Sequence, residues 1–316
     1  MSIVEESDTD GHDRFSSLRL GGLDWDRFPL RLFMVGNARF WDPQAIDYSA
    51  DAADWADAER RAATHLIARS CADEEAAIGT VRPFHATMTA EGRFGDEMYL
   101  SQLSFEKAKH TEGLRLWMDS VGLTEDLNPL VTTNPHQRRL VGEELPTTLD
   151  AMLADRSPET QIRALVTTFL VVQGALAVTG HLSRQYMCMT FGIMPGMRSL
   201  SRFIADDERR HQAWAAFSCR RLLAADPALW SVIGDEMNSR MPTALDLVGW
   251  TCAQAEMAAL HFDAAAAVRY TADCAQRRLE VIGAARDDRP DHIEYDPSPL
   301  MVEDSIGEDD NTFFDG

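Results

Sequence analysis

The chain has 316 residues, 45% of them apolar, which is enough to build one substantial hydrophobic core. Its 30 Lys and Arg against 51 Asp and Glu give a formal net charge of -21. A charge of this sign argues against a polyanionic partner such as nucleic acid and against binding to an anionic membrane surface.

The cysteines and the N-terminus indicate the compartment. The five cysteines are widely spaced, odd in number and without the paired spacing of a metal-binding motif, so we expect reduced thiols. The N-terminus is polar and acidic rather than basic and then apolar, and no apolar run is long enough to span a bilayer. These features predict a cytoplasmic protein with no membrane span.

Three regions are expected along the chain. Residues 1–18 lack a periodic pattern and are predicted to be a flexible acidic lead, and residues 286–316 are rich in Asp, Glu and Pro and are predicted to be an acidic extended tail. Between them, residues 19–285 contain long segments of helical period separated by Gly and Pro. We therefore predict an all-α fold, a helical bundle with additional helices.

The first two long helices carry polar groups in their apolar stripes. The first is predicted from about residue 52 to 90, with Glu74 in the stripe. Its apolar neighbours at steps of three and four are Ala63, Ile67, Cys71, Ile78 and Val81. The second is predicted from about 94 to 121, with Lys107 and His110 in the stripe. Its apolar neighbours are Leu100, Leu103, Leu114, Trp117 and Val121.

Two further helices complete the predicted core. The third begins after Ser157-Pro158, a favourable helix start, and is nearly all apolar from residue 164 to 178. The polar side chains within that stretch are Thr167, Thr168 and Gln173. The fourth starts near Pro195, and Glu208 and His211 interrupt its stripe of Met197, Leu200, Ile204, Ala215 and Leu222.

Charged groups on four inward faces are expected to meet, because burying an unpaired ionised group costs several kcal/mol. Glu208 and His211 lie three residues apart on one helix face, which suits a metal ion approached from one side. Bundles that hold two metals use this pairing on two helices and one carboxylate from each of the other two. Here Lys107 stands three residues before His110, where a Glu is needed, and Gln173 stands in place of a carboxylate.

Other interpretations of these residues stay open. A single Glu-x-x-His pair is common on solvated helix faces, and Glu74 or Gln173 alone fits a hydrogen-bonded structural role equally well. Lys107 could also extend to the surface, with Glu106 turned into the site instead. We favour an inward Lys107, because it keeps register with the apolar stripe of its helix.

The sequence resembles the ribonucleotide reductase small-subunit superfamily, and specifically its ligand-binding oxidase branch. The resemblance extends from about Gly21 to the early tail. It rests on the segments GGLDWDRFPLRLF, GNARFWDP, DEEAAIGTVRPF, AEGRFGDEMYLSQLSFEKAKHTEG, IMPGMRSL and ADDERRHQAW, in this order. The resemblance implies a ferritin-like bundle, a homodimer, a manganese and iron pair, and a fatty-acid-like ligand.

Carried over residue by residue, the six metal-ligand positions of the family fall on Glu74, Lys107, His110, Gln173, Glu208 and His211. Four match the family, and two carboxylates are replaced. The positions of the Val and Tyr that the family cross-links beside its metals are Ala77 and Thr168 here. The resemblance therefore does not extend to this self-oxidation reaction.

The replacements change the charge of the centre. The intact family set carries four carboxylates, whereas Glu74, Glu208 and a cationic Lys107 sum to one negative charge. At about 4 Å and an effective dielectric near 20, repulsion between a dication and an ammonium is on the order of several kcal/mol. We therefore predict at most one Fe or Mn per chain, held by Glu74, His110, Glu208 and His211, or no metal at all.

Three hypotheses for function follow. The first is an oxidoreductase that uses one transition metal and dioxygen on a small or lipid-like apolar ligand between the helices. The second is a metal-free, non-catalytic ligand-binding or partner-binding protein in which Lys107 pairs with the carboxylates and replaces the metal charge. The third uses the acidic tail, in which Phe313 and Phe314 follow acidic residues, to dock a partner subunit.

Overall fold

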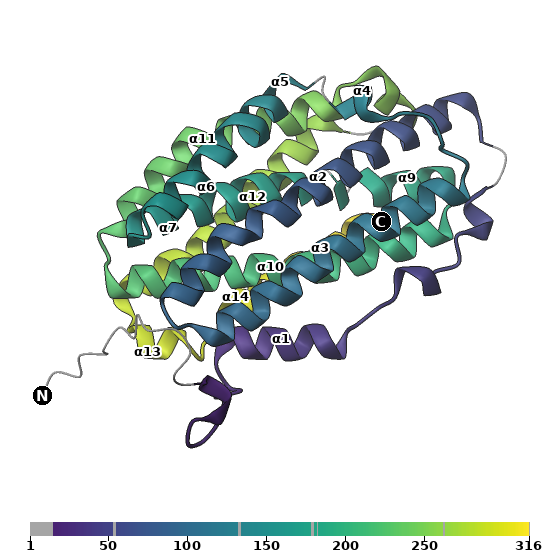
Figure 1. Cartoon of the computed structure of the whole chain (residues 1–316). Helices are drawn as coiled ribbons and strands as arrows, with labels where there is room; N and C mark the ends of the chain where they lie inside the picture. The colour runs from purple at the N-terminus through teal and green to yellow at the C-terminus, as the bar shows by residue number, and fades with distance from the viewer. Residues whose placement is uncertain are drawn as a thin grey trace, which may run out of the picture.

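All regular secondary structure in the computed structural model is helical within the part of the chain that the structure describes, which confirms the all-α prediction (Figure 1). The described residues are 15–52, 55–131, 134–177, 180–181, 183–261 and 263–315. Across these ranges, no helix has both the length and the apolar character that crossing a membrane requires. Of the predicted N-terminal lead, residues 1–14 lie outside the described residues, and Ser16–Leu18 form one 3-10 turn.

Three long helices and one run of consecutive shorter helices form the centre of the bundle. Helices α2 (Asp57–Ala90) and α3 (Phe94–Ser120) form an antiparallel hairpin, and α10 (Pro195–Ala225) packs against α3. The short turn between α2 and α3 contains Gly92 at φ 64°, a left-handed conformation that glycine adopts without strain. The run of shorter helices consists in order of α7 (Pro158–Leu165), the π-helix η5 (Val166–Gln173) and α8 (Gly174–Ala177).

The other helices cover this centre. They are α1 (Phe28–Ala38), α4 (Asn128–Val131), α5 (Pro135–Gln137), α6 (Leu145–Ala154), α9 (Ser183–Phe191), α11 (Leu229–Cys252), α12 (Ala264–Ala284), α13 (Pro290–Ile293) and α14 (Ser298–Asp315). Short 3-10 turns lie at Pro43–Ala45, Ser49–Ala52, Ala255–Leu260 and Ala285–Asp287, and a second π-helix lies at Arg138–Glu144. Helix α1 packs on α3 and α10, while α11 lies against η5 and α12.

The predicted helix starts are close to the observed ones. Helix α7 begins as expected, because the Ser157 hydroxyl accepts a hydrogen bond from the Thr160 amide and Pro158 occupies the first turn. Helix α2 begins at Asp57 rather than near residue 52, because residues 49–52 form a separate 3-10 turn.

The prediction of an extended tail for residues 286–316 is wrong. Most of this segment is α14, which packs along α10 and α12 (Figure 1, yellow). Its acidic residues do not all face solvent, since Glu303 is 1% exposed and both of its carboxylate oxygens accept hydrogen bonds from Arg278. Ile306 is also buried, so an inward face exists that the high content of acidic residues conceals in the sequence. The side chains of Phe313 and Phe314, considered for docking a partner, lie outside the described side chains.

The apolar core is divided into two clusters by a polar layer. On α2, Ile67 belongs to one cluster and Val81 to the other, and Glu74 lies midway between them. On α3, Leu103 and Leu114 flank the layer in the same way, in reverse order along the chain. The antiparallel arrangement of α2 and α3 therefore brings the polar interruptions of their stripes to the same level of the bundle.

Asp51 connects three separate parts of the fold. It is fully buried, and its carboxylate accepts hydrogen bonds from the backbone amides of Gly196 (2.9 Å) and Met197 (2.8 Å) at the start of α10. It also accepts one from the indole of Trp117 on α3 (2.8 Å). A carboxylate at a helix N-terminus satisfies free amides and complements the helix dipole, so Asp51 fixes the start of α10.

We predict that Asp51→Ala lowers the free energy of unfolding by about 3 kcal/mol, because three buried donors lose their acceptor. Urea denaturation followed by circular dichroism measures this. The matched control is Asp47→Ala, at an exposed carboxylate that accepts from the Ser49 amide, and we expect it to cost less than about 1 kcal/mol. Equal losses for the two variants would contradict the role assigned to Asp51.

Candidate metal centre

The polar layer gathers the predicted site residues from three helices. Glu74 comes from α2, Lys107 and His110 from α3, and Glu208 and His211 from α10. All five are less than 9% exposed, and the two imidazoles are fully buried. The helical spacing of three residues within each pair places both side chains of α3 and both of α10 on their inward faces, as predicted.

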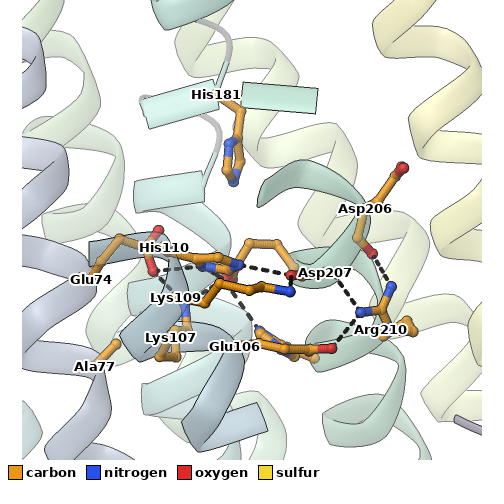
Figure 2. A network of polar contacts seen from close by, with 12 residues as sticks. Glu74, Ala77, Glu106, Lys107, Lys109, His110, His181, Asp206, Asp207 and Arg210 are labelled. Atoms are coloured by element: carbon orange, nitrogen blue, oxygen red, sulfur yellow. Dashed lines mark hydrogen bonds and ion pairs between the residues drawn. The ribbon is translucent and has the colours of Figure 1, made fainter. Parts of the chain in front are cut away.

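Lys107 is the cation at the middle of this layer (Figure 2). Its Nζ atom lies 3.2 Å from Oε2 of Glu74 and 2.5 Å from Oε1 of Glu208. Burial by itself would lower the pKa of Lys107, but the carboxylates of Glu208 and Glu74 outweigh this effect and raise the pKa above its usual value. The ammonium and the two carboxylates thus form an ionic bridge between α2, α3 and α10.

For the carboxylate of Glu74 as well, burial and the neighbouring charges shift the pKa in opposite directions. Burial would raise its pKa, but the charges of Lys107 and His110 lower the pKa to about 2. The pKa of Glu208 is also lowered, against burial, chiefly by Lys107 and then by His211. Both carboxylates are therefore ionised at neutral pH and accept hydrogen bonds only.

Each imidazole lies between two carboxylates. His110 has Nδ1 3.1 Å from Glu74 and Nε2 3.1 Å from Asp207. Burial opposes protonation of His110, but Glu74 and Asp207 outweigh it and raise the pKa of this imidazole to about 9. His211 has Nδ1 3.2 Å from Glu208 and Nε2 2.8 Å from Glu106. In metal centres, a carboxylate on the outer nitrogen fixes the tautomer and the orientation of a ligating histidine.

Glu106 does not replace Lys107, and both side chains are buried. Glu106 is 2% exposed and lies behind His211, where it also accepts a hydrogen bond from Arg210 at 2.6 Å. The sequence-based choice of an inward Lys107 agrees with the structure, but the assumption that the two positions exclude each other is wrong. Consecutive residues on a helix point in directions that differ by about 100°. Lys107 can therefore point to Glu74 while Glu106 points to α10.

A carboxylate that the sequence did not lead us to expect, that of Asp207, lies behind His110. Asp207 is 1% exposed and pairs with Lys109 at 3.1 Å and with Arg210. It also accepts from the indole of Trp41 at 3.0 Å, and this indole is stacked on His110 with ring centroids 6.1 Å apart. Asp207 and Arg210 lie three residues apart on a mostly buried helix, and this spacing could have indicated a buried ion pair. The many charged residues around them in the sequence concealed it.

Gln173 takes no part in the ionic bridge. It is 6% exposed, and neither of its amide atoms has a hydrogen-bond partner in the described part of the chain. It lines two small adjoining cavities, of about 30 and about 20 Å³, together with Asp73 and Ala77. Thr168 lines the second cavity and is fully buried, with no partner for its hydroxyl among the described residues.

Lys107 and Gln173 reduce the negative charge of this centre. The ammonium of Lys107 lies between the two carboxylates that two ions would have to share, and Gln173 supplies a neutral amide where a further charge is needed. Three of the buried residues are placed so that they could hold a metal ion. Glu74, His110 and Glu208 each offer a ligand atom, and these atoms lie within 4.8 Å of one another. His211 lies beside this group through its contact with Glu208.

Comparison with known proteins agrees with this arrangement of helices. No protein-family model matches the sequence. The chain is similar to the crystal structure of an R2-like ligand-binding oxidase from Sulfolobus acidocaldarius, with 30% identity over 90% of this chain and 99% of that chain and a TM-score of 0.79. It is also similar to an R2-like ligand-binding oxidase with an aerobically reconstituted Mn/Fe cofactor, with 26% identity over 85% of this chain and 97% of that chain and a TM-score of 0.77.

These similarities extend over nearly the whole length of the matched proteins, so they concern the complete bundle rather than one motif. They confirm the predicted ferritin-like fold and the resemblance to the ribonucleotide reductase small-subunit superfamily. The chain belongs to the R2-like ligand-binding oxidase family.

Proposed function

We propose that this protein is an oxidoreductase of the ligand-binding oxidase family whose altered centre holds at most one Fe or Mn ion. The observation that carries this proposal is the position of Lys107, whose ammonium contacts both Glu74 and Glu208. A second divalent ion at this place would meet a buried cation at a few ångströms, with a repulsion on the order of several kcal/mol.

One ion would be held by Glu74, Glu208 and His110, with His211 as the fourth candidate ligand. Two imidazoles and a carboxylate are the donor set of mononuclear iron oxygenases, and a bound Fe or Mn ion would supply redox chemistry with dioxygen. The chain's own contribution is to orient the imidazoles through Asp207 and Glu106 and to exclude water from the layer.

The cavity beside the centre supports binding of a small ligand. Its second, mainly apolar chamber is lined by Val141, Leu145, Val172 and two alanines, and it lies next to the centre at Gln173. We propose that a lipid-like or other apolar small molecule occupies this space. Family membership supports a homodimer as the assembly, and the reduced cysteines support a cytoplasmic location.

A metal-free binding protein is the second candidate function. The ion pairs of Lys107 favour it, because the ammonium already satisfies both carboxylates without any metal. In this state the layer is a structural bridge, and the cavity alone carries the function.

Measurement of the metal content tests the proposed limit of one ion per chain. We predict that protein expressed with Fe and Mn available contains no more than one transition metal per chain by elemental analysis. The double variant Lys107→Glu with Gln173→Glu is expected to take up close to two, because it restores two carboxylates and removes the cation. Two metals per chain in the unaltered protein would refute the proposal, and a value near zero would favour the metal-free candidate.

Lys107→Met tests whether the ammonium competes with metal. Without metal, we expect the variant to lose about 3–5 kcal/mol of stability, because two buried carboxylates lose their shared partner. Added Fe or Mn is expected to restore much of the melting temperature, since Glu74, His110 and Glu208 can then bind the ion unopposed. Arg115→Met, at an exposed pair with Asp119, is the control. A variant that metal does not stabilise would contradict a metal-binding role for this group.

A further inference from the structure

Arg210 on α10 is a buried guanidinium that contacts both of the carboxylates behind the imidazoles. It is 1% exposed, and its Nη2 atom donates to Oε1 of Glu106 at 2.6 Å and to Oδ1 of Asp207 at 2.5 Å. Glu106 belongs to α3, whereas Asp207 lies three residues before Arg210 on α10. A single nitrogen of Arg210 therefore joins carboxylates from two helices (Figure 2).

The two oxygens of each carboxylate have separate partners. Glu106 presents Oε1 to Arg210 and Oε2 to Nε2 of His211, at 2.8 Å. Asp207 presents Oδ1 to Arg210 and Oδ2 to Nε2 of His110, at 3.1 Å. A carboxylate that is held at both oxygens cannot turn freely, so the contact with Arg210 limits the plane in which the other oxygen meets the imidazole.

The guanidinium of Arg210 is itself held by the backbone. Its Nη1 atom donates to the carbonyl oxygen of Asp206 at 3.0 Å, one turn earlier on α10. The planar fork of a guanidinium keeps its N–H groups at fixed angles, so this contact also fixes the direction of Nη2. Arg210 is therefore a rigid link between the backbone of α10 and the two carboxylates.

The two carboxylates depend on Arg210 to different extents. Within the described part of the chain, Glu106 has no hydrogen-bond partner besides Arg210 and its imidazole. Asp207 also pairs with Lys109 at 3.1 Å and accepts from the indole of Trp41 at 3.0 Å. Loss of Arg210 is thus expected to displace Glu106 more than Asp207.

The charges around these carboxylates cancel. Glu106 and Asp207 are countered by Arg210 and Lys109, and all four side chains are less than 5% exposed. The carboxylates therefore add no net charge to the neighbouring group that could hold a metal ion. Their contribution to the centre is the orientation of the imidazoles.

We propose that Arg210 is a positioning residue that sets both imidazoles of the centre at once. It acts through Glu106 on the ring of His211, and through Asp207 on the ring of His110. The consequence for metal binding rests on the proposed function, because it requires an ion in the centre. The positioning of the rings does not, because every contact in it is made by the chain.

Nuclear magnetic resonance of the histidine ring nitrogens tests the proposal in full-length protein freed of metal with a chelator. Arg210→Gln is expected to shift the resonances of both imidazoles. The shift is expected to be larger for His211, because Glu106 keeps no other partner among the described residues. An ion pair that only stabilised the packing of α3 on α10 would leave the resonances of both rings unchanged.

Two further variants assign the effect to Arg210. Lys109→Gln is the matched comparison, because it also removes a buried cation but contacts only Asp207 of the two carboxylates, so it is expected to shift chiefly the resonances of His110. Arg289→Gln, at an exposed pair with Asp291, is the control and is expected to leave both imidazoles unchanged.

Metal affinity is measured separately, by titration with Mn²⁺ followed by electron paramagnetic resonance. Arg210→Gln is expected to raise the Kd for Mn²⁺ about 10–100-fold, the usual effect of losing a partner behind a ligating histidine. If the unaltered protein binds no Mn²⁺, the proposed function fails, and the resonances in metal-free protein still decide the role of Arg210.

Two results would overturn the proposal. The first is a folded Arg210→Gln variant in which the resonances of either imidazole are unchanged. The second is a variant in which both imidazoles shift while the Kd for Mn²⁺ stays that of the unaltered protein. If Arg210→Gln does not fold by circular dichroism, Arg210→Lys takes its place, since it keeps the charge without the planar fork. A shift confined to one imidazole in that variant would equally overturn the proposal.

Discussion

The contact of one ammonium with two carboxylates determines how this bundle is organised. Lys107 joins α2 and α10 through Glu74 and Glu208, at the level where the two apolar clusters meet. Without a cation at this place, two carboxylates would repel each other in the interior, where neither water nor salt screens them. The bundle therefore needs a positive charge here, and Lys107 supplies one.

The surroundings of this contact are those of a metal centre. Each imidazole directs one nitrogen to a central carboxylate and the other to a carboxylate behind it, Asp207 or Glu106. Such outer carboxylates orient histidine ligands, and a lysine bridge does not require them. The chain therefore carries outer carboxylates of the kind that orient histidine ligands, beside the group of Glu74, His110 and Glu208 that could hold a metal ion.

A small cavity lies beside the centre. Ala77 and Thr168, which the resemblance places at the positions of the family's cross-linked pair, both line the chamber next to Gln173. The Thr168 hydroxyl and the Gln173 amide are buried there without partners among the described residues. A protein interior normally satisfies such groups, so their presence around one cavity points to an occupant there.

The sequence by itself determined the helical class, the stripes of the long helices and the inward positions of Glu74, Lys107, His110, Glu208 and His211, because these follow from a local period of 3.6 residues. It also indicated the family, since whole segments match in order. Only the tertiary structure decided how these helices are set against one another. The pairing of Lys107 with both carboxylates depends on distances between segments far apart in the chain, and so does the place of Asp207 and Glu106 behind the imidazoles. The sequence did not indicate the terminal helix α14 for a related reason. Its buried face includes a charged residue, Glu303, which a pattern of apolar residues does not reveal. Glu303 is stabilised in the interior by Arg278, which lies on another helix.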